Sequence, residues 1–378
     1  MWCDWPILVF FLFDHGPVYE NQIREMLSKM QISLYLLLFS AAFFPGCMPI
    51  KLNDLDSSHA PGLMISTMLS QTQPSFALFT NTNILLLTKG NGSYSARTMN
   101  GVTTVDRAAA MGKTVFAVAF TDVDTVHLSF DGGMNWANSG ITGLASGTKT
   151  IAGCGTGFSV TGTSGTNLTT AFSTGDTNWT STSQTFTVPA VYSAGCHGSK
   201  FLISYSPSAA PLAGTVAVSQ DGVNYVSTAV GGTSVPLALA SDGTKILAVD
   251  SNPFYYTSTD GGTSYSAASL ISGYSSPWRS VGFLKNRFVG AFYDGSSTCA
   301  ILEFNGTSWA AIPGAAFSCP VAPTFNSIFV NGSNAIISGQ LSGAPVVYRT
   351  NDGGSTWLSD TINEPGVTNI TSVVLLPD

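Results

Sequence analysis

Charged residues are scarce in this sequence. Asp, Glu, Lys and Arg make up 9% of the 378 residues, against about 25% in typical soluble domains. The 14 basic residues form no cluster and the net charge is −7, which argues against a nucleic-acid partner. Helix formers such as Glu, Lys and Gln are also scarce, whereas β-branched residues and turn formers are abundant. This composition predicts an all-β protein with a surface rich in hydroxyl and amide groups.

Residues that carry metal or cofactor chemistry are equally sparse. Beyond residue 47 the chain has two glutamates, Glu303 and Glu364, and three scattered histidines, His59, His127 and His197. None of the histidines has a partner at metal-ligand spacing. No Gly-x-Ser-x-Gly sequence or phosphate-binding loop is present. We therefore expect neither a metal nor a cofactor.

What the sequence does contain is a recurring motif, Ser-x-Asp-Gly-Gly-x-x-Trp, at residues 129–136. Near copies lie at 258–265 and 350–357, and weaker copies at 88–94, 173–179, 219–225 and 304–309. The aromatic residues that close the seven copies follow one another at intervals of 40 to 48 residues. A period of this size indicates an array of similar supersecondary units.

Each repeat offers four short β-like runs. In the fifth repeat they are residues 237–240, 245–249, 254–257 and 265–268. Four short strands in about 40 to 45 residues predict a propeller blade. We therefore predict that residues 75–378 form a seven-bladed β-propeller of four-stranded antiparallel blades.

The two ends of this region predict how the ring closes. The first repeat lacks a clear inner strand, for which residues 63–65 compete, and residues 370–376 follow the last repeat without a blade of their own. Joining both ends in one blade would remove exposed strand edges. We expect the C-terminal strand to be the inner strand of the first blade.

The motif itself has a structural interpretation. Asp-Gly-Gly forms a tight turn between the third and fourth strands, and the Asp side chain accepts hydrogen bonds from the turn's N–H groups. The Ser or Thr hydroxyl joins that network, and the aromatic residue begins the outer strand. The residues assigned to this role are Asp131, Trp136, Asp176, Trp179, Asp221, Tyr225, Asp260, Tyr265, Asn305, Trp309, Asp352 and Trp357.

These copies resemble the Asp-box (BNR) repeat of sialidase-like propellers, sortilin-type receptor domains and photosystem assembly factors. The resemblance implies structural boxes that lie away from the central binding face. Sialidases of this kind bind a carboxylate with three arginines, one in an Arg-Ile-Pro context. The arginines beyond residue 47 are Arg97, Arg107, Arg279, Arg287 and Arg349, and none has that context. Whether the protein is an enzyme stays open. We assign no catalytic residues, and a glycoside hydrolase is the alternative.

The N-terminal part reads as a targeting region. An apolar run covers residues 30–44 behind Lys29, too short for a membrane span of about 20 residues but typical of a signal peptide. It ends at Phe44-Pro-Gly-Cys47, which resembles a bacterial lipoprotein signal with lipidation at Cys47. We predict a leader and signal at 1–46 and a tether at 47–74. We further hypothesise that residues 1–25 precede a true start at Met26. Mass spectrometry of the exported protein tests both statements.

Four cysteines remain after residue 47, an even number that favours disulfides in an exported chain. Cys154 and Cys196 lie 42 residues apart at matching places on the inner strands of adjacent blades. They are expected to form a bridge between blades, with Cys299 and Cys319 pairing around the outer strand of the sixth. Four buried free thiols are the alternative.

A ligand is expected on the face that carries the loops between second and third strands. The candidate residues are Arg107, Asp122, Asp124, Tyr205, Asp250, Trp278, Arg279, Tyr293 and Asp294. For Asp122 and Asp124 the sequence favours loop caps over paired catalytic carboxylates.

Taken together, these features predict an exported, monomeric, lipid-anchored protein of the outer membrane or cell surface that binds a protein or glycan. A periplasmic or secreted location is the alternative. A sialidase-like hydrolase and an envelope assembly factor are the alternative functions.

Overall fold

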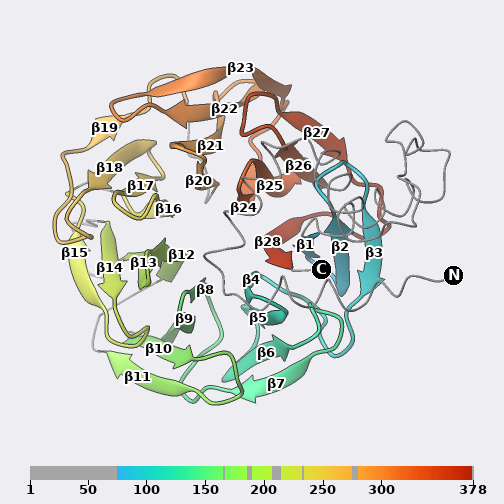
Figure 1. The fold of residues 1–378 in the computed structure, drawn as a ribbon, viewed down its shortest axis with the longest axis vertical. Coiled ribbons are helices and arrows are strands. Elements are labelled where there is room, and N and C mark those ends of the chain that lie inside the picture. Colours follow the sequence, from blue (N-terminus) through green and yellow to red (C-terminus); the bar gives the residue numbers. More distant parts are fainter. Residues whose placement is uncertain are drawn as a thin grey trace, which may run out of the picture. The chain divides into compact units, whose positions relative to one another are not determined.

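The computed structural model describes residues 75–164, 167–184, 190–206, 214–231, 234–274 and 280–376. They form seven four-stranded antiparallel sheets arranged as the blades of a ring (Figure 1), so the predicted seven-bladed β-propeller is confirmed. Within these ranges, no helix has the length and apolar character needed to cross a membrane. The predicted signal, the tether, Cys47 and the competing run at 63–65 lie outside the described residues.

The strands of each blade are given in order from the inner strand to the outer strand. Blade 1 consists of β28 (Ile370–Leu376), β1 (Ser75–Thr80), β2 (Ile84–Thr88) and β3 (Ser95–Thr98). Blade 2 consists of β4 (Arg107–Met111), β5 (Thr114–Val118), β6 (Thr125–Ser129) and β7 (Ala137–Gly140). Blade 3 consists of β8 (Lys149–Cys154), β9 (Gly157–Ser164), β10 (Asn167–Ser173) and β11 (Thr180–Gln184). Blade 4 consists of β12 (Ala190–His197), β13 (Lys200–Ser206), β14 (Thr215–Ser219) and β15 (Val226–Ala229).

The remaining blades follow the same order. Blade 5 consists of β16 (Pro236–Ser241), β17 (Ile246–Asp250), β18 (Phe254–Ser258) and β19 (Ser269–Leu270). Blade 6 consists of β20 (Val281–Leu284), β21 (Arg287–Tyr293), β22 (Thr298–Phe304) and β23 (Trp309–Ser318). Blade 7 consists of β24 (Thr324–Asn331), β25 (Asn334–Leu341), β26 (Ala344–Thr350) and β27 (Leu358–Thr361).

The core lies between blades, and this explains the strand sequences. Side chains of a strand alternate between its two faces, and each blade is covered on both faces by its neighbours. The second strand of blade 2 is therefore apolar at nearly every position, whereas its outer strand β7 is mostly exposed. Phe116 of blade 2 packs edge-on against Phe158 and Trp179 of blade 3, with ring centroids 4.6 and 4.9 Å apart.

The ring closes by joining the two ends of the described chain in blade 1. Strand β28 pairs antiparallel with β1, in a register that runs from Ser75 opposite Leu376 to Thr80 opposite Ile370. Both strands are drawn side by side in Figure 1, although they stand at opposite ends of the colour scale. The predicted closure is therefore confirmed, and β28 occupies the place for which residues 63–65 competed.

Two disulfides join the four cysteines in the pairs expected from the sequence. Cys154 on β8 is bonded to Cys196 on β12, which links the inner strands of blades 3 and 4. Cys299 on β22 is bonded to Cys319, which directly follows β23. The first bridge crosses a blade boundary, and the second closes a loop within one blade.

The repeated motif forms the turn between the third and fourth strands, which we call the motif turn. In blade 2 the Ser129 hydroxyl donates to Asp131 Oδ1 at 2.7 Å and accepts from the N–H of Gly133 at 2.8 Å. Asp131 Oδ1 also accepts from two further N–H groups of the turn, at 3.0 Å each. Asp260 and Asp352 repeat this arrangement in blades 5 and 7. The aspartates thus close turns, as their structural interpretation requires.

One strand assignment was wrong. Residues 265–268 were expected to form the outer strand of blade 5, but that strand is limited to Ser269–Leu270. The hydroxyl of Ser266 accepts a hydrogen bond from the N–H of Thr257 at 3.0 Å. A side chain therefore takes the place of a main-chain carbonyl, and the regular ladder begins only beyond it.

Deletion of residues 367–378 tests the closure. Removing β28 exposes the edge of β1 and strips the inner layer of blade 1, so we expect the cooperative thermal transition to disappear. Circular dichroism on heating and limited proteolysis measure this. A soluble truncated protein with an unchanged melting transition would contradict the role of β28.

Asp131→Asn tests the motif turn. Burial raises the pKa of this carboxyl, but hydrogen bonds from Asn135 and Ser129 outweigh it and lower the pKa to about 2, against about 3.9 in an unfolded chain. The charged carboxylate therefore contributes stability above about pH 4, and this is lost as the pH falls through 2. We expect a loss of about 0.5–1 kcal/mol at pH 7, since the group is solvent-screened, and almost none at pH 2. Urea unfolding at both pH values measures it, and equal losses would refute it.

Candidate functional site

The inner strands of all seven blades surround an axial cavity of about 230 Å³. Because successive strands of a blade are antiparallel, each inner strand begins on the face that carries the loops between second and third strands, here called the loop face. Small side chains such as Ala108, Ala152 and Ala194 line much of the cavity wall. Polar groups enter the cavity from the loop-face ends of several inner strands, which makes this mouth the candidate site.

Arg107 is the one charged side chain among the described residues that line the cavity. It is the first residue of β4, and its Nη1 donates to the carbonyls of Asp106 at 2.5 Å and Thr371 at 3.3 Å. Its guanidinium carbon lies 5.4 Å from the centre of the Phe120 ring. Both hydrogen bonds use Nη1, so Nε and Nη2 keep donors for an acceptor in the cavity.

Neutral polar groups complete the mouth. Asn326 donates through Nδ2 to Asn369 Oδ1 at 2.7 Å and to the carbonyl of Ile370 at 3.0 Å, which leaves its own Oδ1 as an acceptor. The hydroxyl of Tyr192, half-buried on β12, makes no hydrogen bond to any described residue. The mouth therefore offers one cation, an amide oxygen and a phenol to a ligand.

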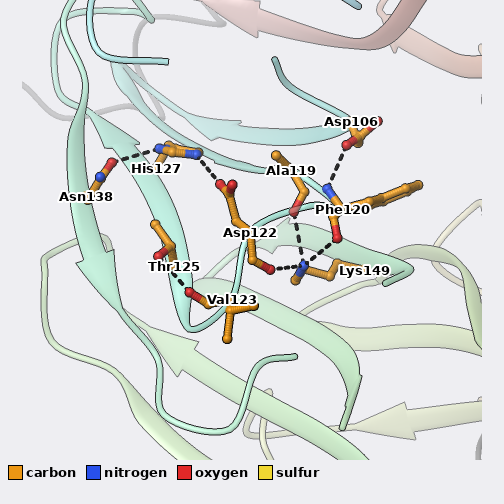
Figure 2. A network of polar contacts seen from close by, with 9 residues as sticks. All are labelled: Asp106, Ala119, Phe120, Asp122, Val123, Thr125, His127, Asn138 and Lys149. Carbon is orange, nitrogen blue, oxygen red and sulfur yellow. Dashed lines mark hydrogen bonds and ion pairs between the residues drawn. The ribbon is translucent and has the colours of Figure 1, made fainter. Parts of the chain in front are cut away.

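A buried lysine holds the loop of blade 2 beside this mouth (Figure 2). Lys149 is 1% exposed, and its ammonium donates to the carbonyls of Ala119, Phe120 and Asp122 at 3.0, 3.3 and 2.7 Å. Burial lowers the pKa of Lys149, and the charges of Asp122 and Asp106 act in the opposite direction. The lysine fixes the β5–β6 loop and with it Phe120, the ring under Arg107.

The predicted candidates of this loop have distinct roles. Asp122 Oδ2 lies 2.6 Å from His127 Nε2, while His127 Nδ1 lies 2.8 Å from Asn138 Oδ1 (Figure 2). Asp124 adopts a φ of 50° and accepts the N–H of Leu144 at 2.8 Å. Both aspartates therefore support the loop, as the cap interpretation expects.

Two predicted ligand-face residues are buried and unavailable to a ligand. Tyr205 is 3% exposed, and its hydroxyl donates to Ser227 at 2.7 Å. Asp250 is fully buried, and its carboxylate accepts from the N–H groups of Asn252 and Phe254 and from the hydroxyl of Tyr256. These two assignments were wrong because strand ends on the loop face turn their side chains between blades as well as outward.

The remaining candidates lie apart from Arg107. The carboxylate of Asp294 accepts three N–H groups of its own β21–β22 turn, led by that of Thr298, which hold its pKa well below the usual range. Tyr293 donates to the carbonyl of Ser296 in the same turn at 2.9 Å. Trp278 and Arg279 lie outside the described residues.

Other arginines are engaged far from the cavity. Arg287 forms an ion pair with Glu303 across β21 and β22, and Arg349 pairs with Asp360 at 2.7 Å across β26 and β27. No Asp or Glu is among the described residues that line the axial cavity. Within the described ranges, no group of three or more His, Cys, Asp or Glu could hold a metal ion.

Sequence reasoning missed Lys149, Tyr192 and Asn326. A sequence signal existed for the lysine, which opens an otherwise uncharged inner strand in a chain where basic residues are rare. The tyrosine and the asparagine had none, because their position at the mouth follows from the assembly of seven blades.

The fold has counterparts among solved structures. YCF48 bound to D1 peptide aligns with a TM-score of 0.50 and 16% identity over 81% of this chain and 96% of that one. A GH74 xyloglucanase from Xanthomonas campestris aligns with a TM-score of 0.50 and 10% identity over 82% of this chain and 53% of that one. No family model and no curated protein matches the sequence. At these identities the likeness is one of fold alone.

Lys149→Met tests the support of the mouth. The methionine fills the space but leaves three main-chain carbonyls without their donor, so we expect a loss of about 2 kcal/mol in the free energy of unfolding. Urea unfolding measures it, with Lys113→Met in the exposed β4–β5 turn as the matched control. Equal effects of the two changes would show that Lys149 has no supporting role.

Proposed function

We propose that this protein is an exported binding module that holds a segment of another polypeptide at the cavity mouth on the loop face. The observation that carries the proposal is Arg107, the one charged side chain among the described residues of a cavity lined otherwise by small, apolar and neutral polar groups. A guanidinium with unused donors recognises a carboxylate. The neutral wall suits the main chain of a peptide.

The class of partner is supported by two further points. YCF48, which shares the fold, has been solved with a bound peptide. A glycosidase of the paired-carboxylate type needs two carboxylates about 5–10 Å apart across its cleft, and the described cavity lining contains none. A peptide carrying a carboxylate, at a side chain or at its C-terminus, is therefore favoured over a glycan substrate.

The location and the repeat class belong to the same proposal. The apolar run before Cys47 supports export and lipid anchoring at a bacterial surface, with an envelope or host protein as partner. The hydrogen bonds of Asp131, Asp260 and Asp352 support classing the motif turns as Asp-boxes of a sialidase-like propeller.

Selection of displayed random peptides on the full-length protein tests the proposed function. Enriched peptides should share a carboxylate and compete for one site. Arg107→Gln should weaken their binding about tenfold or more, since a charge-assisted hydrogen bond is lost. The control is Arg97→Gln on the outer strand β3, which should leave binding unchanged.

Three outcomes would contradict the proposal. The first is an absence of enriched peptides, and the second is binding that Arg107→Gln leaves intact. The third is turnover of a glycoside panel, which would favour the hydrolase instead.

A further inference from the structure

A second cavity, of about 310 Å³, lies between blades 5 and 6. It opens on the turn face, the face opposite the loop face, where the motif turns and the turns between first and second strands lie. Blade 5 contributes Asp242 and Lys245, and blade 6 contributes its motif turn at Phe304, Asn305 and Gly306. No residue of this cavity takes part in the site at the axial mouth.

Other blade boundaries show what normally fills this position. The motif turn of blade 7 lies against blade 6, where Lys285 Nζ donates to the carbonyl of Asp352 at 3.2 Å and Arg287 Nη2 to that of Gly353 at 3.1 Å. The motif turn of blade 1 lies against blade 7 in the same way, with Arg349 Nη1 donating to the carbonyl of Gly90 at 3.2 Å. At these two boundaries a cation of one blade binds main-chain carbonyls of the next motif turn.

The glycines of these turns fit closely against neighbouring side chains. A Cβ added at Gly354 would lie 3.0 Å from Leu284 of the preceding blade, and one added at Gly133 would lie 3.3 Å from Leu85. Both glycines have positive φ, 84° and 88°. The crevice between two blades therefore accepts a turn of main chain without side chains at its closest point.

The motif turn of blade 6 does not fill its crevice. It runs from Phe304 to Trp309, two residues shorter than the turn from Thr350 to Trp357 in blade 7. Phe304 stands where the other six blades have a Ser or Thr. A Cβ added at Gly306 would meet nothing within 4 Å, unlike the glycines of the full-length turns. The second cavity is the space that a complete turn would occupy.

Lys245 is the cation of this vacant crevice. Its carbonyl accepts the N–H of Asp242 at 3.1 Å, and it directly precedes the second strand of blade 5, much as Arg287 begins the second strand of blade 6. Its ammonium lies 5.8 Å from the centre of the Phe304 ring and makes no hydrogen bond to a described residue. In contrast to Lys285, it keeps its donors for an acceptor from outside.

We propose that this crevice is a second binding site, which takes a glycine-containing turn of a partner polypeptide. A main-chain carbonyl of that turn binds Lys245, and its glycine main chain lies against Phe283 and Phe304. The charges of the lining balance, because Asp242 and Glu303 accompany Lys245 and Arg287. A balanced lining suits neutral peptide dipoles better than a free anion. The proposal does not rest on binding at the axial mouth.

A cyclic peptide containing residues 351–356, Asn-Asp-Gly-Gly-Ser-Thr, is the probe, because this sequence fills the equivalent crevice of the neighbouring blade. We expect saturable binding to the full-length protein by fluorescence anisotropy. Lys245→Met should weaken it about tenfold or more. The matched control Lys285→Met, whose ammonium faces a complete turn, should leave the affinity unchanged. The same peptide with valine at both glycine positions should not bind.

A loop graft tests the location independently. Replacing residues 305–308 by Asn-Asp-Gly-Gly-Ser-Thr gives blade 6 a motif turn of full length behind Phe304, which should abolish peptide binding while the melting temperature stays equal or rises. Arg107→Gln should leave this binding intact, so failure here is distinguishable from failure at the axial mouth. The proposal is overturned if the unaltered protein shows no saturable binding, or if binding persists in both Lys245→Met and the graft.

Discussion

The structure depends on the pairing of β28 with β1. A ring of sheets buries each blade between two neighbours only if no blade boundary is left open. The pairing places residues from the end of the described chain beside residues from its start, at a separation of nearly the whole propeller. Contacts this distant in sequence form late and slowly in folding, because their loop-closure entropy is large.

The motif turns act as a second layer of attachment between blades. In the turns of blades 2, 5 and 7 the aspartate and the hydroxyl satisfy main-chain N–H groups of the turn itself. Between blades, a cation and a close glycine contact join the turn to the preceding blade. Aromatic pairs such as Phe116 with Trp179 add about 0.5–1.5 kcal/mol each. The same device therefore decides which crevices are closed and which, as between blades 5 and 6, are open.

The two cavities differ in their electrostatics. At the axial mouth a single guanidinium stands in a neutral wall, which gives an incoming carboxylate one place to bind. In the crevice between blades 5 and 6 each cation has an acid nearby, and Lys245 makes no hydrogen bond to a described residue. Because charged residues are so rare in this chain, each uncommitted cation marks a place where the surface is chemically distinct.

The sequence alone determined the fold, the closure of the ring and the pairing of the cysteines. Seven aromatic anchors at a near-constant interval count the blades, the unassigned run at 370–376 closes the ring, and two cysteine pairs fall at bridging positions. These features are local or periodic, so they can be read along the chain. The start of the blade 5 outer strand was misjudged because a serine hydroxyl takes the place of a main-chain carbonyl, which a β-pattern cannot reveal.

The sites were decided by the tertiary structure. Tyr205 and Asp250 stand at loop-face strand ends, as the half-buried candidate Tyr293 does, yet the packing of adjacent blades buries them almost completely. Tyr192, Asn326 and Arg107 line the same cavity only because seven inner strands surround one axis. Lys245 likewise has no motif turn to bind because the turn of the next blade is two residues shorter than that of blade 7. Such properties depend on which surfaces face each other, and sequence spacing does not contain that information.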